Sequence, residues 1–351
     1  MLTGDSQPAL WITESDVVSL MDMPAAIRAL EAGLRAEAGG AAINMTKTHV
    51  SWPAGDASPG KPSAGSSSSE GTLHAIGAAF PNAGFVGTKT WAHTPQGATP
   101  LVILYDSRTG ALRAVIEAFA MGQLRTGAAS GLATRMLSAE NAAELAIVGT
   151  GKQALAQVAA VHAVRPLERV RVFGRDADRR RRFSERVKED LGLDVVEAGS
   201  VEEAVRGAPI VTAVTRARDP FLFAAMIARG AHINAVGAIV PAGAEVAADV
   251  LARCTRIVAD SPEQARRLSR ELIEFCGGAP GGWEKVTRLA DLVASGERRT
   301  AADDVTLFKA LGMGISDLSL GIEVYTGACR AGAGKQIEPP QRAAPRLRAE
   351  T

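Results

Sequence analysis

The chain has 351 residues, a length that accommodates two domains with substantial cores and excludes a small disulfide-stapled scaffold. Its 39 lysine and arginine residues balance 38 acidic residues, and 4% of its residues are aromatic. The sequence therefore shows neither the positive charge nor the stacking surface expected of a nucleic-acid-binding protein. Three dispersed cysteines, Cys254, Cys276 and Cys329, predict reduced thiols rather than a disulfide or a metal site.

The beginning of the chain predicts no export signal. Residues 1–8 include Asp5 and lack both the basic and the apolar region of a signal peptide. The most apolar later stretch, residues 231–248, is interrupted by Pro241, Gly243 and Glu245 before it reaches the roughly 20 apolar residues of a membrane-spanning helix. We therefore expect a cytoplasmic protein without a membrane segment.

The first third of the chain predicts a helical segment followed by an antiparallel sheet. Apolar residues at helical spacing over 13–37, with Thr13 and Asp22 as capping residues, predict the helices. The β-prone runs that follow lie at residues 43–52, 72–80, 85–94, 101–105 and 111–116, with a turn at 106–110. A stretch rich in Ser, Gly and Pro at 54–71 predicts a mobile loop.

The pattern then changes to alternating strands and helices, which is typical of α/β proteins with a doubly wound parallel sheet. Residues 121–139 predict a long helix, Glu144–Val148 a buried strand and Ala177–Leu191 a further helix. More strands are predicted at 170–173, 209–214, 231–236 and 256–259. From Val305 the sequence predicts helix again, and residues 331–351 predict a loosely held tail.

A glycine motif follows the strand Glu144–Val148 directly. Its residues are Gly149, Thr150, Gly151, Lys152, Gln153 and Ala154, and a helix is predicted after them. In such a motif the first glycine makes a tight turn, the second lets the backbone approach a pyrophosphate, and the small third residue lets helix and strand pack closely. Strand, motif, helix and second strand together predict a dinucleotide-binding site.

The second strand of this unit ends in Gly174, Arg175 and Asp176, without a carboxylate at the strand end to hold the ribose 2′-hydroxyl of NAD. Arg175 is placed to accept a 2′-phosphate, with Arg179 and Arg180 as helpers, which favours NADP(H) and leaves NAD(H) open. The alternative is a solvated basic helix start capped by Asp176. Four residues at the ends of later strands are predicted to border the same cleft: Thr215, Val236, Gly237 and Asp260.

Several segments resemble the ornithine cyclodeaminase/mu-crystallin family. They are Gly87-Thr88-Lys89, residues 124–130, residues 148–154, residues 232–238, and residues 307–312 with Asp317. The matches keep the family's order over residues 13–325. The resemblance implies an α+β domain for substrate binding and dimerisation, made of residues 1–138 with 306–351. It also implies a Rossmann domain inserted at 139–305, and a homodimer.

The resemblance further implies that Lys89 and Arg125 hold the carboxylate of a small substrate and carry catalysis, and that Thr126 adjoins the cofactor. A third cation of the family, an arginine, is replaced by Lys47, which as a point charge cannot make the two-pronged contact of a guanidinium. From the residues alone, an internal ion pair or an exposed position is an alternative for these cations. His93, on the same strand face as Lys89, is either a proton donor or a structural histidine.

One departure from the family decides the expected chemistry. Cyclodeaminases of the family carry an aspartate two residues after Gly237, where this chain has Ile239. A hydrocarbon neither pairs with an ammonium group nor transfers protons, and Ile239 is expected to face the substrate side chain instead. Glu245 matches a family glutamate, although an exposed carboxylate at a helix start explains it equally well.

What the resemblance then implies is an NAD(P)H-dependent oxidoreductase that reduces the C=N bond of a small imino acid to an amino acid, or catalyses the reverse dehydrogenation. Two alternatives remain. One is a cyclodeaminase that recycles its cofactor and releases ammonia, and the other is a non-catalytic, NADPH-binding protein of the crystallin kind.

Overall fold

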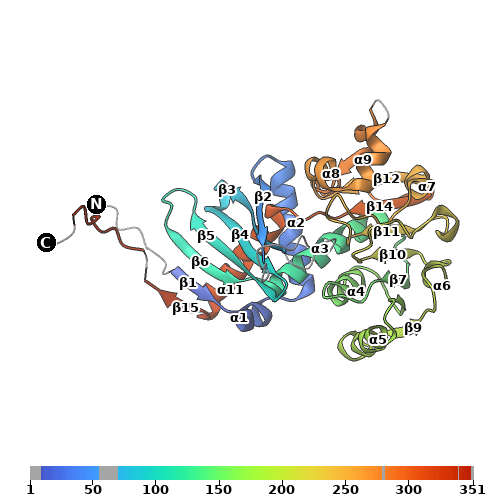
Figure 1. Ribbon diagram of the computed structural model, residues 1–351, viewed down its shortest axis with the longest axis horizontal. Coiled ribbons are helices and arrows are strands. Elements are labelled where there is room, and N and C mark those ends of the chain that lie inside the picture. The colour runs from blue at the N-terminus through green and yellow to red at the C-terminus, as the bar shows by residue number, and fades with distance from the viewer. Residues whose placement is uncertain (1–8, 55–69, 279–280, 339, 349–351) are drawn as a thin grey trace, which may run out of the picture.

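The computed structural model describes residues 9–54, 70–278, 281–338 and 340–348, and contains two β-sheets with a long helix between them (Figure 1). The first sheet has seven strands in the order β15-β1-β6-β5-β4-β3-β2. They are β1 (Ala9–Ile12), β2 (Ile43–Pro53), β3 (Glu70–Phe80), β4 (Phe85–Thr94), β5 (Gly97–Asp106), β6 (Leu112–Glu117) and β15 (Lys335–Ile337). Only the β1–β6 pair is parallel among the pairs described, so the predicted antiparallel sheet is confirmed for strands β2 to β6.

The second sheet has eight strands in the order β13-β12-β14-β11-β10-β7-β8-β9, paired in parallel throughout. They are β7 (Glu144–Val148), β8 (Arg169–Phe173), β9 (Asp194–Glu197), β10 (Ile210–Ala213), β11 (His232–Ala235), β12 (Cys254–Ala259), β13 (Val286–Arg288) and β14 (Val305–Lys309). This order, with β7 and β10 adjacent at the centre, confirms the predicted Rossmann sheet.

Helices cover both faces of the parallel sheet because successive strand residues point to opposite sides. On β7, Leu145 and Ile147 belong to the core under α4 (Ala154–His162) and α5 (Ala177–Leu191). Ala146 and Val148 belong to the core on the other face. The helices there are α6 (Val201–Val205), α7 (Ala248–Arg253), α8 (Pro262–Leu268) and α9 (Arg270–Gly277).

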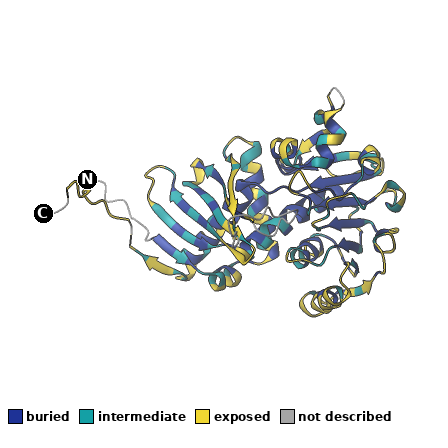
Figure 2. Cartoon of the chain, viewed as in Figure 1, coloured by how far each residue is buried: buried dark blue, intermediate teal, exposed yellow. Residues whose placement is uncertain are grey.

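The first sheet buries one face and leaves the other partly exposed (Figure 2). Val102 and Leu104 of β5 pack in a core with α2 (Met23–Ala38), α3 (Phe119–Leu137) and α11 (Gly314–Ala331). The two remaining α-helices are α1 (Glu14–Leu20) and α10 (Leu289–Ser295). Within the described ranges, no helix is both long and apolar enough to cross a membrane.

Local signals in the first third of the chain act as predicted. Thr13 caps α1, and Asp22 caps α2 by accepting a hydrogen bond from the Ala25 N–H (2.8 Å). In the turn between β5 and β6, Asp106 Oδ1 accepts from two backbone N–H groups, and Gly110 adopts a positive φ of 71°. These short-range bonds fix the ends of the elements.

Two predictions about the end of the chain are wrong. The segment from Val305, predicted as helix, is the buried strand β14, which lies between β11 and β12 in the parallel sheet. The predicted boundary at 305/306 therefore falls inside β14, and the chain leaves the parallel sheet only after Lys309. The predicted tail contains β15, which pairs with β1 at the edge of the first sheet. The predicted loop at 54–71 lies almost entirely outside the described residues.

A seam of buried polar side chains joins α3 to the parallel sheet. His232 is hydrogen bonded to Thr306 (3.0 Å) and to Asn234 (3.1 Å). Asn234 in turn contacts Thr134 of α3 (3.0 Å), and the Thr306 hydroxyl donates to the Leu137 carbonyl (2.8 Å). Because α3 also packs in the core of the first sheet, this seam connects the two halves of the molecule.

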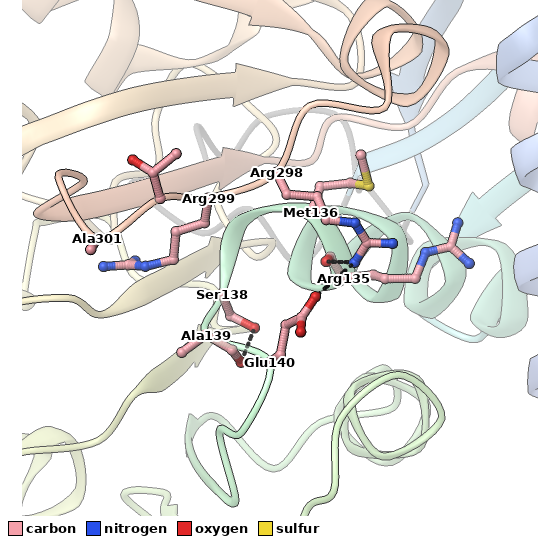
Figure 3. Close-up of a pocket in the computed structure, with 9 residues that line it drawn as sticks. Arg135, Met136, Ser138, Ala139, Glu140, Arg298, Arg299 and Ala301 are labelled. Atoms are coloured by element: carbon pink, nitrogen blue, oxygen red, sulfur yellow. Dashed lines mark hydrogen bonds and ion pairs between the residues drawn. The ribbon is translucent and has the colours of Figure 1, made fainter.

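Arginine side chains gather at the carboxyl end of α3. The buried Arg165 guanidinium donates to the carbonyls of Thr134, Arg135 and Ser138, and the backbone N–H of Arg299 donates to the Met136 carbonyl (2.8 Å). Beside them is a hollow of about 300 Å³, lined among others by Arg135, Arg298, Arg299 and Glu140 (Figure 3). Arg165 thereby complements the unpaired carbonyls of the helix end.

Candidate active site

A second cation cluster lies where α3, β4 and α11 meet. Alternation along β4 places Lys89 on the inner face of the first sheet, opposite Ile76 and Val102. Its Nζ lies 2.9 Å from Oδ1 of Asp317, in the first turn of α11, and Nε of Arg125 lies 3.3 Å from the same oxygen. Lys89 is 5% exposed and Asp317 is fully buried. The structure thus brings the two predicted anchors together on one carboxylate.

This cluster keeps unused hydrogen-bonding capacity. Nε of Arg125 and Oδ2 of Asp317 are buried without a hydrogen-bond partner in the described part of the chain. The Arg125 side chain is 20% exposed, so part of its guanidinium faces open space. Gly312, with a φ of 83°, lies against this guanidinium, and a Cβ there would be 2.7 Å from Nη1. Such a group can still bind a planar carboxylate with two parallel hydrogen bonds.

The electrostatics of the cluster favour an anion. Burial lowers the pKa of Lys89, and the neighbouring Arg125 lowers it further. Burial and the charges of Arg125 and Lys89 lower the pKa of Lys47 as well. Burial alone would raise the pKa of Asp317, but Arg125 and Lys89 hold it below its usual value. Three cationic groups face one carboxylate, so a bound anion relieves their mutual repulsion.

An aromatic stack forms the side wall of this cluster. The rings of His74 and Trp91 are stacked with their centroids 4.7 Å apart, and His49 stacks on His74 at 5.5 Å. Nζ of Lys89 lies 5.2 Å and Nζ of Lys47 5.8 Å from the Trp91 centroid. Burial lowers the pKa of His74 to about 4, so the His74 ring in this wall is uncharged at neutral pH.

Arg125 does not lie at the start of its helix. α3 begins at Phe119, so Arg125 lies in the second turn rather than at the helix start. The carboxylate of Glu14 accepts hydrogen bonds from the N–H groups of Phe119 and Ala120 at the true start. The amino end of α3 is therefore occupied by a side chain of the protein, and only the guanidinium of Arg125 is directed at the site.

The glycine motif at the end of β7 has the shape that a dinucleotide requires. Gly149 has a φ of 112°, and a Cβ there would meet the Val214 carbonyl. Gly151, in contrast, faces open space, since a Cβ there would meet no atom within 4 Å. Gln153 Oε1 is buried without a hydrogen-bond partner in the described residues, just before α4 begins at Ala154. Open space in front of a helix start fits a pyrophosphate.

The remaining residues of the motif lie around this turn. Thr150 packs against Gly174, the first residue after β8. A Cβ on Gly174 would lie 3.0 Å from the Thr150 side chain. Nζ of Lys152 lies 5.4 Å from the Phe119 ring at the start of α3. The hydroxyl of Thr126 donates within its own helix to the Gly122 carbonyl (2.8 Å).

At the end of β8, the arginines take different positions. Arg175 is exposed beside the turn. Arg180 instead donates to the Gly174 carbonyl (2.8 Å) and to Glu197 (3.0 Å), which makes it part of the framework. Asp176 caps α5 by accepting from the Arg179 N–H (2.9 Å), as the alternative interpretation of this segment predicts.

The two turns after β10 and β11 meet at Glu245, and one of the two interpretations of this residue is excluded. Glu245 is fully buried and not an exposed carboxylate at a helix start. It accepts hydrogen bonds from Thr215 and from the Gly237 N–H. Val236 is buried beneath this turn, while Ile239 is 38% exposed and Val240 52%. Ile239 therefore presents hydrocarbon beside the strand ends.

Asp260, which follows β12, fixes a turn by accepting backbone hydrogen bonds, as Glu245 does. Its carboxylate accepts from the N–H groups of Leu311 and Gly312, and burial raises its pKa. Gly312 is the residue that abuts Arg125. Asp260 is thus a support of the turn between β14 and α11, one step removed from the cation cluster.

Helix α3 carries Arg125 of the cation cluster and also packs on the helix that follows the glycine motif. Gly127, two residues after Arg125, packs so closely on α4 that a Cβ would lie 2.6 Å from the Ala156 carbonyl. α4 starts directly after the motif. The helix that carries Arg125 therefore packs directly on the helix that follows the glycine motif. The described residues contain no group of three His, Cys, Asp or Glu side chains able to hold a metal ion.

Comparison with known proteins assigns the chain to a family. The profile of the ornithine cyclodeaminase/mu-crystallin family matches residues 9–331, and the chain belongs to this family. Over 241 residues it is 32% identical to the Δ¹-pyrroline-2-carboxylate reductase of Bacillus cereus, covering 68% of this chain and 74% of that one.

Two solved structures share the fold over nearly the whole chain. The Δ¹-pyrroline-2-carboxylate reductase of Thermococcus litoralis, in complex with NADH and L-proline, superposes with a TM-score of 0.82 at 26% identity, covering 93% of this chain and 100% of that one. An archaeal alanine dehydrogenase dimer with bound NAD gives a TM-score of 0.82 at 27% identity, covering 95% and 99%. The predicted family is confirmed.

Proposed function

We propose that this protein is an NAD(P)H-dependent oxidoreductase that reduces the C=N bond of a small imino acid to an amino acid, or catalyses the reverse dehydrogenation. The observation that carries the proposal is the buried Lys89–Asp317–Arg125 cluster, in which two cations converge on one carboxylate, with Arg125 on a helix that packs on α4, the helix that follows the glycine motif. Membership of a family that contains imino-acid reductases and an alanine dehydrogenase supports it.

The residues of the chain act by binding and orienting the substrate. Arg125 and Lys89 hold the substrate carboxylate, and Lys47 adds a third positive charge. Holding the carboxylate fixes the position of the adjacent C=N carbon relative to the coenzyme, and this fixed geometry favours the reaction between them. A bound nicotinamide coenzyme supplies or accepts the hydride. Asp317 keeps the two anchors charged and in place.

The site favours reduction over ring-closing deamination. Ile239 presents hydrocarbon where the related cyclodeaminases are expected to carry an acid, and the Trp91–His74 wall is uncharged. A second amine on the substrate would meet no carboxylate at either position. The alternative, a cyclodeaminase with another acid, predicts ammonia release without net consumption of coenzyme.

NADPH is proposed over NADH as the coenzyme. Arg175 is exposed beside the turn at Gly174, where a 2′-phosphate is expected, and Arg180 is occupied by Glu197. The related structures with NADH and NAD support nicotinamide binding in general. Arg175→Ala is expected to weaken NADPH binding about tenfold and NADH binding less than twofold.

A homodimer is also proposed. The face of the first sheet opposite Lys89 carries Leu73, Thr90, Leu101, Ile103 and Val115, all partly exposed in the single chain. A second copy would cover this face, as apolar strand faces require. Light scattering after gel filtration tests the mass. The division into two domains and the cytoplasmic location remain predictions, with the end of the inserted domain after Lys309 rather than at 305.

A spectrophotometric screen tests the activity. The purified protein is mixed with NADPH or NADH and with cyclic ketimine carboxylates, or with 2-oxo acids plus ammonia or methylamine, while ammonia release is assayed on ornithine and lysine. Loss of reduced coenzyme on an imine supports the proposal. Ammonia without coenzyme loss would replace it with the cyclodeaminase, and binding without any turnover would favour the non-catalytic protein.

A further inference from the structure

The buried Glu245 forms a junction between two turns of the parallel sheet. Its Oε1 accepts hydrogen bonds from the backbone N–H (2.6 Å) and the hydroxyl (2.8 Å) of Thr215, which follows β10. Its Oε2 accepts from the N–H groups of Gly237 (2.7 Å) and Ala238 (3.1 Å), which follow β11. One side chain thus fixes the ends of two neighbouring strands to each other.

Only a carboxylate satisfies this arrangement. Both oxygens accept two hydrogen bonds each, and every partner is a donor. The amide of a glutamine would present an NH₂ group to one of the two donor pairs, so that one turn would have to move away. Burial raises the pKa of Glu245, while the donated hydrogen bonds and the charge of Lys309 favour its ionised form.

The two turns lie where the reactive end of a dinucleotide is expected. In doubly wound sheets ligands bind beyond the carboxyl ends of the strands, near the central switch point. β10 is the immediate neighbour of β7, and a Cβ on Gly149 would collide with the Val214 carbonyl and approach Thr215 (3.2 Å). The turn held by Glu245 therefore touches the first glycine of the coenzyme motif.

Gly237 shows how little freedom this junction leaves. A Cβ at this position would collide with the backbone N and O of Thr215 and with Glu245 Oε1. The two turns are in direct backbone contact, and a shift of either one moves the other. Ile239, the expected neighbour of the substrate side chain, is two residues further along the same turn.

A second layer holds Glu245 itself. Oε1 of Glu271 on α9 accepts from the N–H groups of Glu245 (2.6 Å) and Val246 (2.9 Å). Its Oε2 accepts from Nζ of Lys309 (2.6 Å), and both side chains of this pair are at most 2% exposed. Lys309 is the last residue of β14, which pairs with β11. The network that supports the end of β11 is therefore itself anchored on β14, the neighbouring strand.

We propose that Glu245 is a positioning residue that locks the Thr215 and Gly237–Ala238 turns into the surface that receives the nicotinamide end of the coenzyme. The inference rests on the proposed function, because it assigns these turns to a nicotinamide coenzyme. It concerns the reactive half of the coenzyme and predicts no effect on the half that carries the pyrophosphate, which the Gly149–Ala154 turn receives.

The test uses the purified full-length chain and compares two ligands. ADP-ribose contains the adenosine and pyrophosphate but no nicotinamide, and NADH contains both halves; the 2′-phosphorylated pair is measured in parallel. Affinities are determined by calorimetry for the wild type, Glu245→Gln and Glu245→Asp. Glu274→Gln is the matched control, because Glu274 is an exposed glutamate one turn from Glu271 on α9. The fluorescence emission of bound NADH reports the nicotinamide environment.

We expect Glu245→Gln to weaken NADH binding about tenfold, to shift its emission toward that of free NADH, and to change ADP-ribose binding less than twofold. Glu245→Asp, which keeps four acceptor positions on a shorter side chain, should recover part of the loss. The control should match the wild type. If Glu245→Gln weakens both ligands equally, or neither, the positioning role is refuted.

The outcomes also separate this inference from the proposed function. If the wild type reduces no imino acid but Glu245→Gln still weakens NADH selectively, the reductase proposal fails and the positioning role stands. If imine reduction is found and Glu245→Gln retains the wild-type kcat and NADH affinity, the positioning role fails alone. Binding of neither ligand by the wild type would overturn both.

Discussion

The two ends of α3 carry similar sets of charged side chains for different purposes. In its amino-terminal half, Arg125 and Lys89 converge on the buried carboxylate of Asp317. At its carboxyl end, Arg165 and Arg299 direct their donors at main-chain carbonyls. The hollow of about 300 Å³ lies at the carboxyl end, beside the second set.

The difference lies in which hydrogen bonds are already made. Arg165 makes five hydrogen bonds within the protein, so its charge is used to terminate a helix. At the other end, Arg125 Nε and Asp317 Oδ2 lack partners among the described residues. Arg299 keeps one such nitrogen as well, but it donates to two carbonyls of the protein. Neither the number of arginines nor the size of a hollow identifies the site.

Removing the anchors should produce the largest effect. Lys89→Ala and Arg125→Ala are each expected to lower kcat/KM on the best imino acid by about 100-fold or more, with KM raised and kcat lowered together, because the reacting carbon is no longer held. Steady-state kinetics measures this. If both variants keep kcat/KM within about twofold of the wild type, the assignment of this end of α3 is refuted.

Replacing Arg165 should lower the stability of the fold and leave kcat/KM nearly unchanged. Arg165→Met leaves several buried carbonyls without donors and is expected to lower the free energy of unfolding by about 3 kcal/mol. Urea denaturation measures this, and kcat/KM at 20 °C should stay within about twofold for the folded fraction. A native circular-dichroism spectrum combined with a large loss of kcat/KM would show that the two ends of α3 are not separate in function.

The pH dependence of substrate binding should come from the amino-terminal half. Burial and the neighbouring cations lower the pKa of Lys47, so a rise in pH removes its charge earlier than in a free lysine. The KM for an imino acid should therefore rise in alkaline solution, by about threefold to tenfold up to pH ~10. Lys47→Arg keeps its charge there and should reduce this rise.

The control for this experiment is Lys335→Arg on the exposed strand β15, which should reproduce the wild-type profile. If Lys47→Arg and the wild type show the same alkaline rise in KM, Lys47 does not contribute to the grip on the carboxylate.

The smallest effect is expected at the hollow. Arg298 makes an ion pair with Glu140 at 3.5 Å, and both side chains are mostly exposed. Arg298→Ala should change the free energy of unfolding by less than about 0.5 kcal/mol and kcat/KM by less than about twofold. Activity lost in this variant, with stability retained, would make the hollow part of the function.

Most of the fold could be predicted because its signals are local. The strands β4 and β7 and the helix α5 have the predicted bounds, since alternation, glycines and capping residues mark them. β14 was missed because its signal is not local. Val305–Lys309 ends in a lysine that looks like a surface residue, and only Glu271 from α9 explains its burial.

The candidate site shows the same limit. Lys89 and Arg125 were predicted through the family resemblance, and the structure brings them together. Their partner Asp317 was part of the resembling motif, but 228 residues separate it from Lys89 and no spacing rule links the two. For Glu245, an exposed carboxylate at a helix start was an equally good interpretation, because a carboxylate normally avoids burial. Its four donors come from two turns whose meeting only the tertiary structure defines.

The seam around His232 sets a limit on acid tolerance. In the folded protein, burial lowers the pKa of His232 to about 3, whereas in the unfolded chain it is near the usual value of about 6.5. Between these two pH values His232 binds a proton in the unfolded state and does not bind one in the folded state. Stability that is present above pH ~6.5 is therefore lost as the pH falls, by about 1 kcal/mol per pH unit. Acidification thus works against the junction that holds α3, with Arg125 on it, to the parallel sheet.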